Sequence, residues 1–363
     1  MTSRGLSVAL ATIAVVFSTF LALANNHAGS PQASASGTVE WIDTHVNLVA
    51  GMRRNFSAAL QEALAAMDEV GIRMAVIMPT PQTSSAPAHY DYDDFVSAVK
   101  KYPARFAFMG GSSLNRIIHD TGHESKPDKD LRYKFEKKAN EIITQGGVGF
   151  GEMGAQHLSL TQGHPYSSVP AHHPLFLLLA DITARHEAVI DLHFDMVAED
   201  MPLPDPLASP PNPPTLHANL AAFERLLAHN RKAKIVWAHA GSDQLGHWTV
   251  DVSRKLLQRH PNLYMSLRLM PGRAPWNHPL TPAMEIKPPW LRLLQDFPDR
   301  FVIGGDQFFT APKVGGSGPG FFFSQRAPVS RKRTMAFLSL LPQDLARKIG
   351  YENAIRLYKL EPS

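Results

Sequence analysis

Eight short apolar runs recur along this sequence, and most of them are followed by a loop and then by a stretch with helical spacing. The runs are rich in β-branched and aromatic residues and are apolar at nearly every position, which is typical of parallel strands covered on both faces. They occupy residues 39–48, 72–79, 106–111, 148–154, 188–195, 233–241, 263–270 and 301–308. The helical stretches between them include residues 57–70, 92–102, 131–145, 174–186, 216–230 and 250–259.

Repeated strand-then-helix units predict an α/β fold with a closed parallel sheet, a (β/α)8 TIM barrel that forms a single domain over residues 38–363. An open, doubly wound sheet is the alternative, but its glycine-rich phosphate loop does not follow the first strand. Three long connections, at residues 112–130, 156–173 and 196–215, come after strands. This places them on the carboxyl face, where barrel enzymes build their sites. A fourth, at residues 310–326, is either a lid or a loop packed on the rim.

The first residues indicate export. Arg4 precedes an apolar stretch over residues 6–23 that ends in an Ala-Leu-Ala cleavage site. We therefore predict a signal peptide at residues 1–24, a polar linker at residues 25–37, and a periplasmic or secreted protein. A retained anchor helix is the alternative, since the apolar stretch is about as long as a bilayer span requires.

Composition narrows the classes of site and partner. The chain has no cysteine, which excludes thiolate metal ligands and cysteine nucleophiles. Its net charge of +4 comes from scattered basic residues, and the one basic run, at residues 331–333, is typical of a solvated helix start. We expect a small-molecule substrate, no nucleic-acid partner and no stable membrane association after signal cleavage. Whether the chain forms a homo-oligomer stays open.

Titratable side chains stand at the ends of the apolar strands. His239 ends the sixth strand and Asp306 ends the eighth. Alternating polar positions are Asp43, His45 and Asn47 in the first strand and Asp191, His193 and Asp195 in the fifth. Such groups face inward in a barrel and are unsatisfied unless they pair or bind a cation. A single strand histidine is more often a hydrogen-bonded structural residue, but three imidazoles and a carboxylate at matching strand ends favour a metal site suited to Zn²⁺.

From about Glu40 to its end, the sequence resembles the amidohydrolase superfamily in its amidohydrolase-related (type 2) branch. The resemblance rests on the order of the motifs IDTH, GFGEMG, DLHFD, VWAHAG, VIGGDQF and ENAIRLYKL. It implies a metal-dependent hydrolase that holds a divalent ion, Zn²⁺ or one of its neighbours. His45 and His193 match the family's metal-binding histidines, and Asp306 matches the aspartate that contacts both metal and water. His239 matches a histidine that binds a second metal in some members and polarises or protonates the substrate in others.

One position departs from the family's pattern. The first strand normally carries His-x-His, and here the second of these positions is Asn47. Three interpretations stay open: Asn47 is a weak ligand, Glu152 of the fourth strand replaces the missing histidine, or metal binding has been lost. Glu152 alone could equally pair with a nearby arginine or histidine.

The resemblance implies that a metal-activated water attacks a carbonyl of an amide, lactone or ester. Asp306 would act as general base, and His239 would stabilise the oxyanion or protonate the leaving group. Arg268 either holds a substrate carboxylate or phosphate inside the pocket or forms a salt bridge on the rim. The alternatives to a hydrolase are a non-oxidative decarboxylase of the same family and a metal-free ligand-binding barrel.

The remaining polar residues receive supporting or neutral roles. The three aspartates of strands one and five are predicted to orient imidazoles through their second nitrogen. The other histidines lie in loops or at helix starts, where some are candidates to line the pocket and most are expected to be ordinary surface residues: His119, His123, His157, His164, His172, His173, His247 and His278.

Overall fold

The computed structural model describes residues 39–82, 89–122, 126–161, 163–207, 211–314 and 319–361. The predicted signal peptide, the predicted linker and His123 lie outside the described residues. Among the described residues, every helix is too short or too polar to cross a bilayer.

The described strands form two mainly parallel sheets and one small antiparallel pair. The first sheet has the order β12-β1-β2-β3, and the second has the order β11-β10-β9-β6-β4-β5, in which only β5 runs antiparallel to its neighbour. The small pair is β7 (Met201–Pro202) with β8 (Thr215–Leu216). The strands of the two larger sheets are β1 (Trp41–Val49), β2 (Ile72–Ile77), β3 (Phe106–Phe108), β4 (Gly149–His157), β5 (Ser167–Ser168), β6 (Val189–Phe194), β9 (Lys234–Ala240), β10 (Leu263–Leu267), β11 (Phe301–Ile303) and β12 (Gln307–Thr310).

Two contacts bring the edges of the larger sheets together. Gly110, just after β3, forms an isolated parallel bridge with Phe150 of β4. At the other edge, the Thr44 hydroxyl of β1 donates a hydrogen bond of 2.9 Å to the carbonyl of Ile303 in β11. Each of the eight predicted runs contains a strand, and the eighth run contains both β11 and the first residues of β12. The predicted α/β fold is therefore confirmed, whereas the closed barrel stays a prediction.

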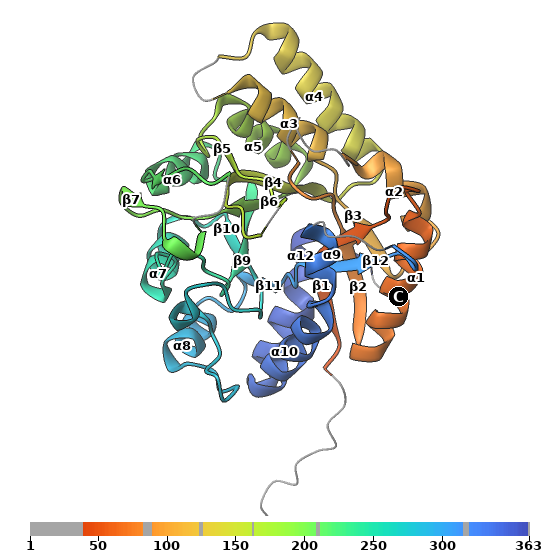
Figure 1. The fold of residues 1–363 in the computed structure, drawn as a ribbon, viewed down its shortest axis with the longest axis vertical. Coiled ribbons are helices and arrows are strands. Elements are labelled where there is room, and N and C mark those ends of the chain that lie inside the picture. Colours follow the sequence, from red (N-terminus) through yellow and green to blue (C-terminus); the bar gives the residue numbers. More distant parts are fainter. Residues whose placement is uncertain are drawn as a thin grey trace, which may run out of the picture. The chain divides into compact units, whose positions relative to one another are not determined.

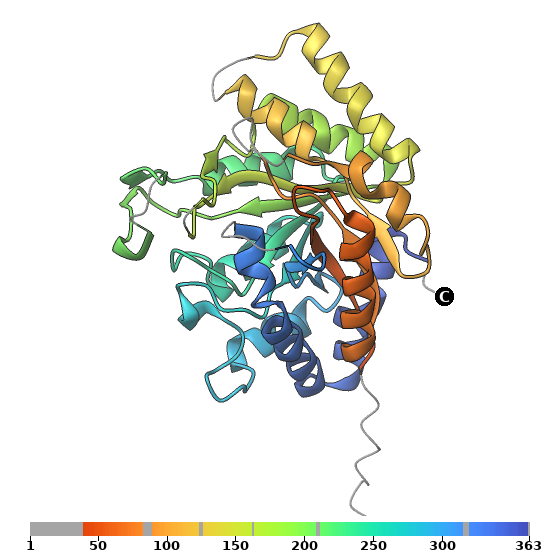
Figure 2. The same cartoon turned by 45° about the vertical axis from the view of Figure 1, so that its right-hand side comes forward.

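Helices surround the strands in both views of the molecule (Figures 1 and 2). Helix α1 illustrates how the sequence sets their limits: the Asn55 side chain accepts a hydrogen bond from the Ala58 N–H at its start, and Gly71 ends it with φ of 74°. The longer helices are α1 (Phe56–Val70), α2 (Tyr92–Val99), α3 (Ser112–Thr121), α4 (Lys129–Thr144), α5 (Pro174–His186), α6 (Leu220–His229), α7 (Val250–Arg259), α8 (Pro288–Asp296) and α10 (Ala327–Leu340). Shorter ones are η1 (Asp205–Leu207), η2 (Pro275–Asn277), α9 (Pro319–Ser324), α11 (Gln343–Arg347), the π-helical η3 (Lys348–Glu352) and α12 (Asn353–Tyr358).

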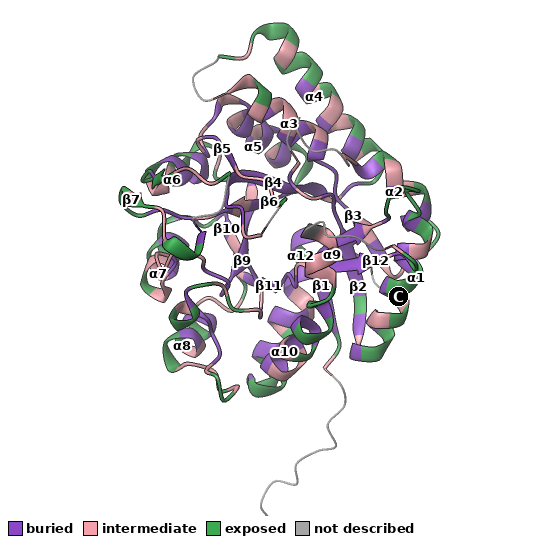
Figure 3. Cartoon of the chain, in the orientation of Figure 1, coloured by how far each residue is buried: buried purple, intermediate pink, exposed green. Residues whose placement is uncertain are grey.

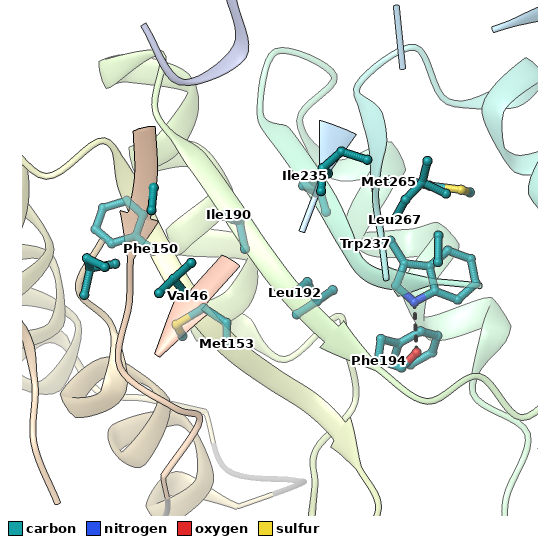
Figure 4. Close-up of a cluster of buried hydrophobic side chains, with 14 of the residues drawn as sticks. Val46, Phe150, Met153, Ile190, Leu192, Phe194, Ile235, Trp237, Met265 and Leu267 are labelled. Atoms are coloured by element: carbon teal, nitrogen blue, oxygen red, sulfur yellow. Dashed lines mark hydrogen bonds between the residues drawn. The ribbon is translucent and has the colours of Figure 1, made fainter. Parts of the chain in front are cut away.

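The largest apolar core lies between the strands and the helices. The burial map shows purple strands, and green residues lie on the helices around them (Figure 3). In the part of this core drawn in Figure 4, the Trp237 indole donates a hydrogen bond of 2.9 Å to the Phe194 carbonyl, which satisfies its buried N–H. The indole also stacks on Trp248, with ring centroids 3.6 Å apart. This packing holds β6 and β9 in register below the ends that carry His193 and His239.

A second apolar cluster occupies the amino-terminal halves of the strands. Ile42, Val189, Val236 and Val302 come from β1, β6, β9 and β11, and they pack with Leu357 of α12. Burial of each such side chain contributes about 1.5–3 kcal/mol to folding. The same four strands therefore begin in an apolar cluster and end, a few residues later, in polar side chains.

Two predictions about polar segments are wrong. The connection at residues 112–130 is not a plain loop, because α3 occupies Ser112–Thr121 and buries Leu114 and Ile118. The basic run at residues 331–333 does not start a helix in solvent. It lies inside α10, where the Arg331 guanidinium is buried near the Gln307 side chain and stacks over the Phe309 ring. Sequence spacing alone did not reveal that this arginine faces the strands.

Candidate metal centre

Five of the predicted site residues meet where the parallel strands end. His45 comes from β1, Glu152 from β4, His193 from β6 and His239 from β9, while Asp306 follows β11. His45 is completely buried, and Glu152 and His239 are 4% and 7% exposed. Parallel strands carry their carboxyl ends to the same edge, so residues up to 261 positions apart in the chain become neighbours.

The Glu152 carboxylate is the centre of this cluster. Its Oε1 lies 2.7 Å from Nδ1 of His193 and 3.0 Å from Nε2 of His239. Its Oε2 lies 3.4 Å from Nε2 of His45. One carboxylate thus contacts imidazoles from three different strands, which agrees both with a pairing to histidines and with a replacement for the missing ligand.

Three aspartates, predicted to orient imidazoles, take different positions. Asp195 Oδ2 lies 3.2 Å from Nε2 of His193, on the strand that carries both residues. Asp191 Oδ1 lies 3.1 Å from Nδ1 of His45, on a different strand. Asp43 contacts no imidazole; it accepts hydrogen bonds from the backbone N–H groups of His45 and Gly305. The prediction is therefore wrong for Asp43, because its carboxylate accepts hydrogen bonds from these two backbone N–H groups instead.

Asp306 lies between Arg268 and the imidazole cluster. Its Oδ2 forms an ion pair of 3.0 Å with Nη2 of Arg268, and its Oδ1 lies 3.8 Å from Nε2 of His45. The Asn47 amide donates a hydrogen bond of 3.4 Å to the same Oδ1. Arg268 also donates to the Ser242 hydroxyl at 3.2 Å. The guanidinium therefore points into the site, and the predicted rim salt bridge is replaced by an ion pair with a candidate catalytic carboxylate.

The backbone is strained at two of these positions. His239 has φ of 72° and Asp306 has φ of 50°, both in the left-handed region that favours glycine. Each such conformation costs of order 1–3 kcal/mol and persists only where the surrounding structure holds it. Two strained residues whose side chains share one cluster are typical of a functional site.

The electrostatics of the cluster keep charged groups buried together. Burial alone would lower the pKa of His45, but the carboxylates of Asp191 and Glu152 hold that pKa well above its usual range. Burial likewise opposes ionisation of Glu152, and His45, His193 and His239 still hold its pKa well below the usual value. Despite burial, Asp195 and Glu152 raise the pKa of His193 to about 10. The carboxylates around His45 and His193 therefore favour the protonated form of both imidazoles.

The pKa values of His239 and Asp306 are lowered, whereas those of His45 and His193 are raised. Burial lowers the pKa of His239, which leaves its imidazole neutral at pH 7. Burial would raise the pKa of Asp306, but the neighbouring Arg268 guanidinium outweighs burial and lowers that pKa. A neutral imidazole beside an ionised carboxylate is a pair that can exchange one proton with a bound reactant.

One group of ligand atoms among the described residues could hold a metal ion. Atoms of His45, Glu152 and His239 lie within 4.8 Å of one another, and all three side chains are buried. The set includes Glu152, which the sequence offered as one of three alternatives, and it differs from the predicted set by omitting His193, Asn47 and Asp306. Nε2 of His45, Nδ1 of His239 and Oδ1 of Asn47 are buried without a hydrogen-bond partner. Imidazole nitrogens and a carboxylate are the donors that Zn²⁺ and its neighbours prefer, so the residues fit a divalent ion.

Two of the remaining histidines, some of which were candidates to line the pocket, extend the cluster. The ring of His157 lies 4.4 Å from that of His193, and the ring of His164 lies 4.6 Å from that of His157. Burial and the neighbouring His193 lower the pKa of His157 to about 4. Strand β4 ends at His157, three residues beyond its predicted end at Gly154, so a longer predicted strand would have revealed this residue. His173 and His278 are also buried, each 1% exposed.

A small cavity lies against the cluster. Its volume of about 20 Å³ is large enough for a water molecule. His193, Asp195, His239 and Arg268 are among its lining residues. A water oxygen in this cavity would therefore lie near the Arg268 guanidinium, the Asp195 carboxylate and the imidazoles of two histidines.

Comparison with known proteins identifies the family. The sequence model described as amidohydrolase matches residues 40–360. The chain belongs to the amidohydrolase family. No curated protein sequence matches it. Membership of the amidohydrolase family confirms the resemblance carried by the strand-end motifs.

The chain also matches solved structures. The phosphotriesterase from Mycobacterium tuberculosis matches with a TM-score of 0.50 at 10% identity, and the match covers 89% of this chain and 95% of that one. The 2,6-dihydroxybenzoate decarboxylase from Rhizobium matches with a TM-score of 0.43 at 13% identity, over 88% and 98% of the two chains. Amidohydrolase 2 from Bifidobacterium longum subsp. infantis gives 0.35 at 11% identity, over 89% and 100%.

Proposed function

We propose that this chain is a metal-dependent hydrolase in which water attacks the carbonyl of a small amide, lactone or ester. The observation that carries the proposal is the Glu152 carboxylate, which contacts the imidazoles of His45, His193 and His239 beside the Asp306–Arg268 ion pair. This combination supplies metal ligands, a base and a fixed positive charge in one buried place.

We also propose that the parallel strands of the two larger sheets form an eight-stranded (β/α)8 barrel. In this count β11 and β12 together make the eighth strand, and the antiparallel β5 is left out. The contacts between Gly110 and Phe150 and between Thr44 and Ile303 support closure at both edges. In such a barrel the cluster lies at the carboxyl face, where other barrel enzymes have their active sites.

His45, Glu152 and His239 would hold the divalent ion, with His193 and Asp306 next to them. When bound, a divalent ion such as Zn²⁺ polarises the substrate carbonyl and lowers the pKa of a water molecule from 15.7 to about 7. The raised pKa values of His45 and His193 describe the ion-free cluster, in which protons supply the positive charge. Binding would release such protons, since imidazole ligates only as the free base.

Asp306 is the proposed general base. Its Oδ2 is occupied by Arg268, so Oδ1, 3.8 Å from Nε2 of His45, is the atom that can take a proton from water. The lowered pKa of Asp306 keeps this carboxylate ionised at neutral pH. In this arrangement His239 is a ligand. Only if it did not hold the ion could its single N–H, which faces Glu152, donate to the developing oxyanion or to the leaving group.

Measurement of bound metal tests the proposal. We expect about one divalent ion per chain in protein purified without chelator, and less than about a tenth of that in Glu152→Gln, because an amide is a poorer ligand than a carboxylate of the same shape. Glu187→Gln is the matched control, since Glu187 is an exposed residue that pairs with Lys359. Equal metal content in wild type and Glu152→Gln would contradict the proposed centre, and metal-free wild type would favour a ligand-binding barrel.

A decarboxylase is the second candidate, and one observation favours it. Arg268 points into the site and lines its cavities, where a guanidinium can hold a carboxylate that is to be lost. Assays of carbon dioxide release and of acid release on the same panel of aryl acids, esters and lactones separate the two. Carbon dioxide from an arylcarboxylate would replace the hydrolase proposal.

The site of action is proposed from the N-terminal residues alone. We propose that the mature protein works outside the cytoplasm, on a small molecule, after cleavage behind Ala24. The apolar stretch and its small-residue ending support this proposal. N-terminal sequencing of protein recovered from the periplasm or the medium tests it, and an intact Met1 would contradict it.

A further inference from the structure

A second cavity begins at Asp306 and extends away from the imidazole cluster. Its volume is about 230 Å³, which is enough space for several non-hydrogen atoms of a ligand. Its walls are the segment after β10 that includes Met270 and Arg273, the turn at Gly305, and the residues from Phe322 in α9 to the start of α10. Because Asp306 is one of its lining residues, a molecule whose carbonyl reacts at Asp306 would place its remaining atoms here.

The lining of this cavity has an excess of positive charge. Three arginines, Arg268, Arg273 and Arg326, and a single carboxylate, that of Asp306, contribute to it, which gives a net charge of +2. The carboxylate is already paired with Arg268. In the part of the chain that the structure describes, neither Arg273 nor Arg326 has an ion pair with an acidic side chain. These two exposed guanidiniums can therefore pair with an anionic ligand.

The surroundings of the two arginines are built for contact with a ligand. The guanidinium of Arg326 stacks over the Phe322 ring, with its central carbon 4.3 Å from the ring centroid, which fixes its plane and leaves its N–H edge free. Arg273 is held loosely, by one hydrogen bond of 3.4 Å from its Nη2 to the carbonyl of Leu160. Leu160 and Phe323 add apolar surface to the same cavity. An apolar or aromatic body with an anionic end matches this combination.

We propose that this cavity binds the non-reacting end of the substrate, and that this end carries a carboxylate or phosphate held by Arg273 and Arg326. The inference rests on the proposed function, since it assigns the reacting carbonyl to Asp306. Paired N–H donors of a guanidinium match the oxygens of both kinds of anion. The substrate class is therefore an apolar or aromatic molecule with a hydrolysable carbonyl at one end and an anionic group at the other.

Calorimetric titration with three probes tests the cavity without requiring turnover. Benzoate and phenyl phosphate carry the two anions, and benzamide is the neutral control of the same shape. We expect the protein to bind at least one of the anions about tenfold more tightly than benzamide. We expect Arg273→Gln and Arg326→Gln each to weaken that binding about fivefold, the effect of losing one partly exposed charge pair. Arg292→Gln, which removes an exposed charge from α8 away from the cavity, should leave it unchanged.

The outcomes separate this inference from the proposed function. If benzoate or phenyl phosphate binds through the metal centre, Glu152→Gln will abolish binding and the two arginine variants will not change it, which overturns the inference. Equal affinity for benzamide overturns it as well. If Glu152→Gln keeps its metal but the arginine variants lose the anion, the proposed metal centre fails and the anion cavity stands. Preference for benzoate over phenyl phosphate, or the reverse, identifies the anion.

Discussion

At their amino-terminal halves, the strands bury Ile42, Val189, Val236 and Val302 against one another and against Leu357. Three or four residues further along the chain, at the carboxyl ends, these strands are followed by polar side chains: three histidines and one aspartate. The first region consists of side chains that need no partner once they leave water, and its packing is favourable by the hydrophobic effect alone.

The carboxyl-end region shows the opposite balance. Among the described residues, the side-chain oxygen of Asn47 and Nδ1 of His239 are buried without a hydrogen-bond partner, and the backbone is strained at His239 and Asp306. Each unsatisfied buried polar group costs of order 1–3 kcal/mol. Residues that raise the free energy of the fold persist where they serve chemistry, so the comparison assigns stability to one end of the strands and function to the other.

The largest expected effect concerns the proposed base at the carboxyl ends. Asp306→Asn should lower kcat by about a thousandfold, equivalent to about 4 kcal/mol, because an amide cannot accept the proton that Oδ1 takes from water. The measurement is kcat on the best substrate found in a panel of esters, lactones and amides, with the thermal midpoint recorded in parallel. Asp299→Asn, at an exposed residue that pairs with Lys348, is the control. Rates near those of the wild type would show that Asp306 is not the base.

A truncation in the apolar cluster at the amino-terminal halves of the strands should lower stability and leave the metal site intact. Leu357→Ala removes a side chain that is 1% exposed, and we expect it to lower the free energy of unfolding by about 3 kcal/mol while metal content per chain stays the same. Urea denaturation measures the effect. Leu340→Ala is the matched control, because Leu340 is 50% exposed in α10 and its truncation should change stability by less than about 0.5 kcal/mol. Loss of metal from folded Leu357→Ala would break the separation between the two ends.

Sequence patterns predicted the strands well because parallel strands covered on both faces are apolar throughout. The same uniformity hides which face a residue takes once a strand is irregular. Strict alternation placed Asp43 on the same face as His45, but its carboxylate binds the backbone N–H of Gly305, a contact that spacing along β1 does not reveal. Helix α3 was missed because its polar residues and short apolar face resemble a loop.

The residues of the site were predicted better than the contacts between them. His45, His193, His239 and Asp306 do converge, since each stands at a strand end and the fold brings these ends together. The central place of Glu152 could not be derived, because spacing along β4 does not tell how far a glutamate reaches between three strands. The pairing of Asp191 with His45 joins strands that are 146 residues apart, and such a contact depends on the tertiary structure alone.

The smallest expected effect concerns the position where the chain departs from its family's usual His-x-His pattern. Asn47 is completely buried, its amide nitrogen is bonded to Asp306, and its oxygen has no partner. Asn47→His should tighten Zn²⁺ binding about tenfold, or about 1.4 kcal/mol, because an imidazole is a better ligand than an amide oxygen. Competition with a chromogenic chelator measures the affinity, and Asn47→Ala, which removes the amide without adding a ligand, is the control. If both variants bind Zn²⁺ equally, residue 47 does not reach the ion, and Glu152 alone compensates for the missing histidine.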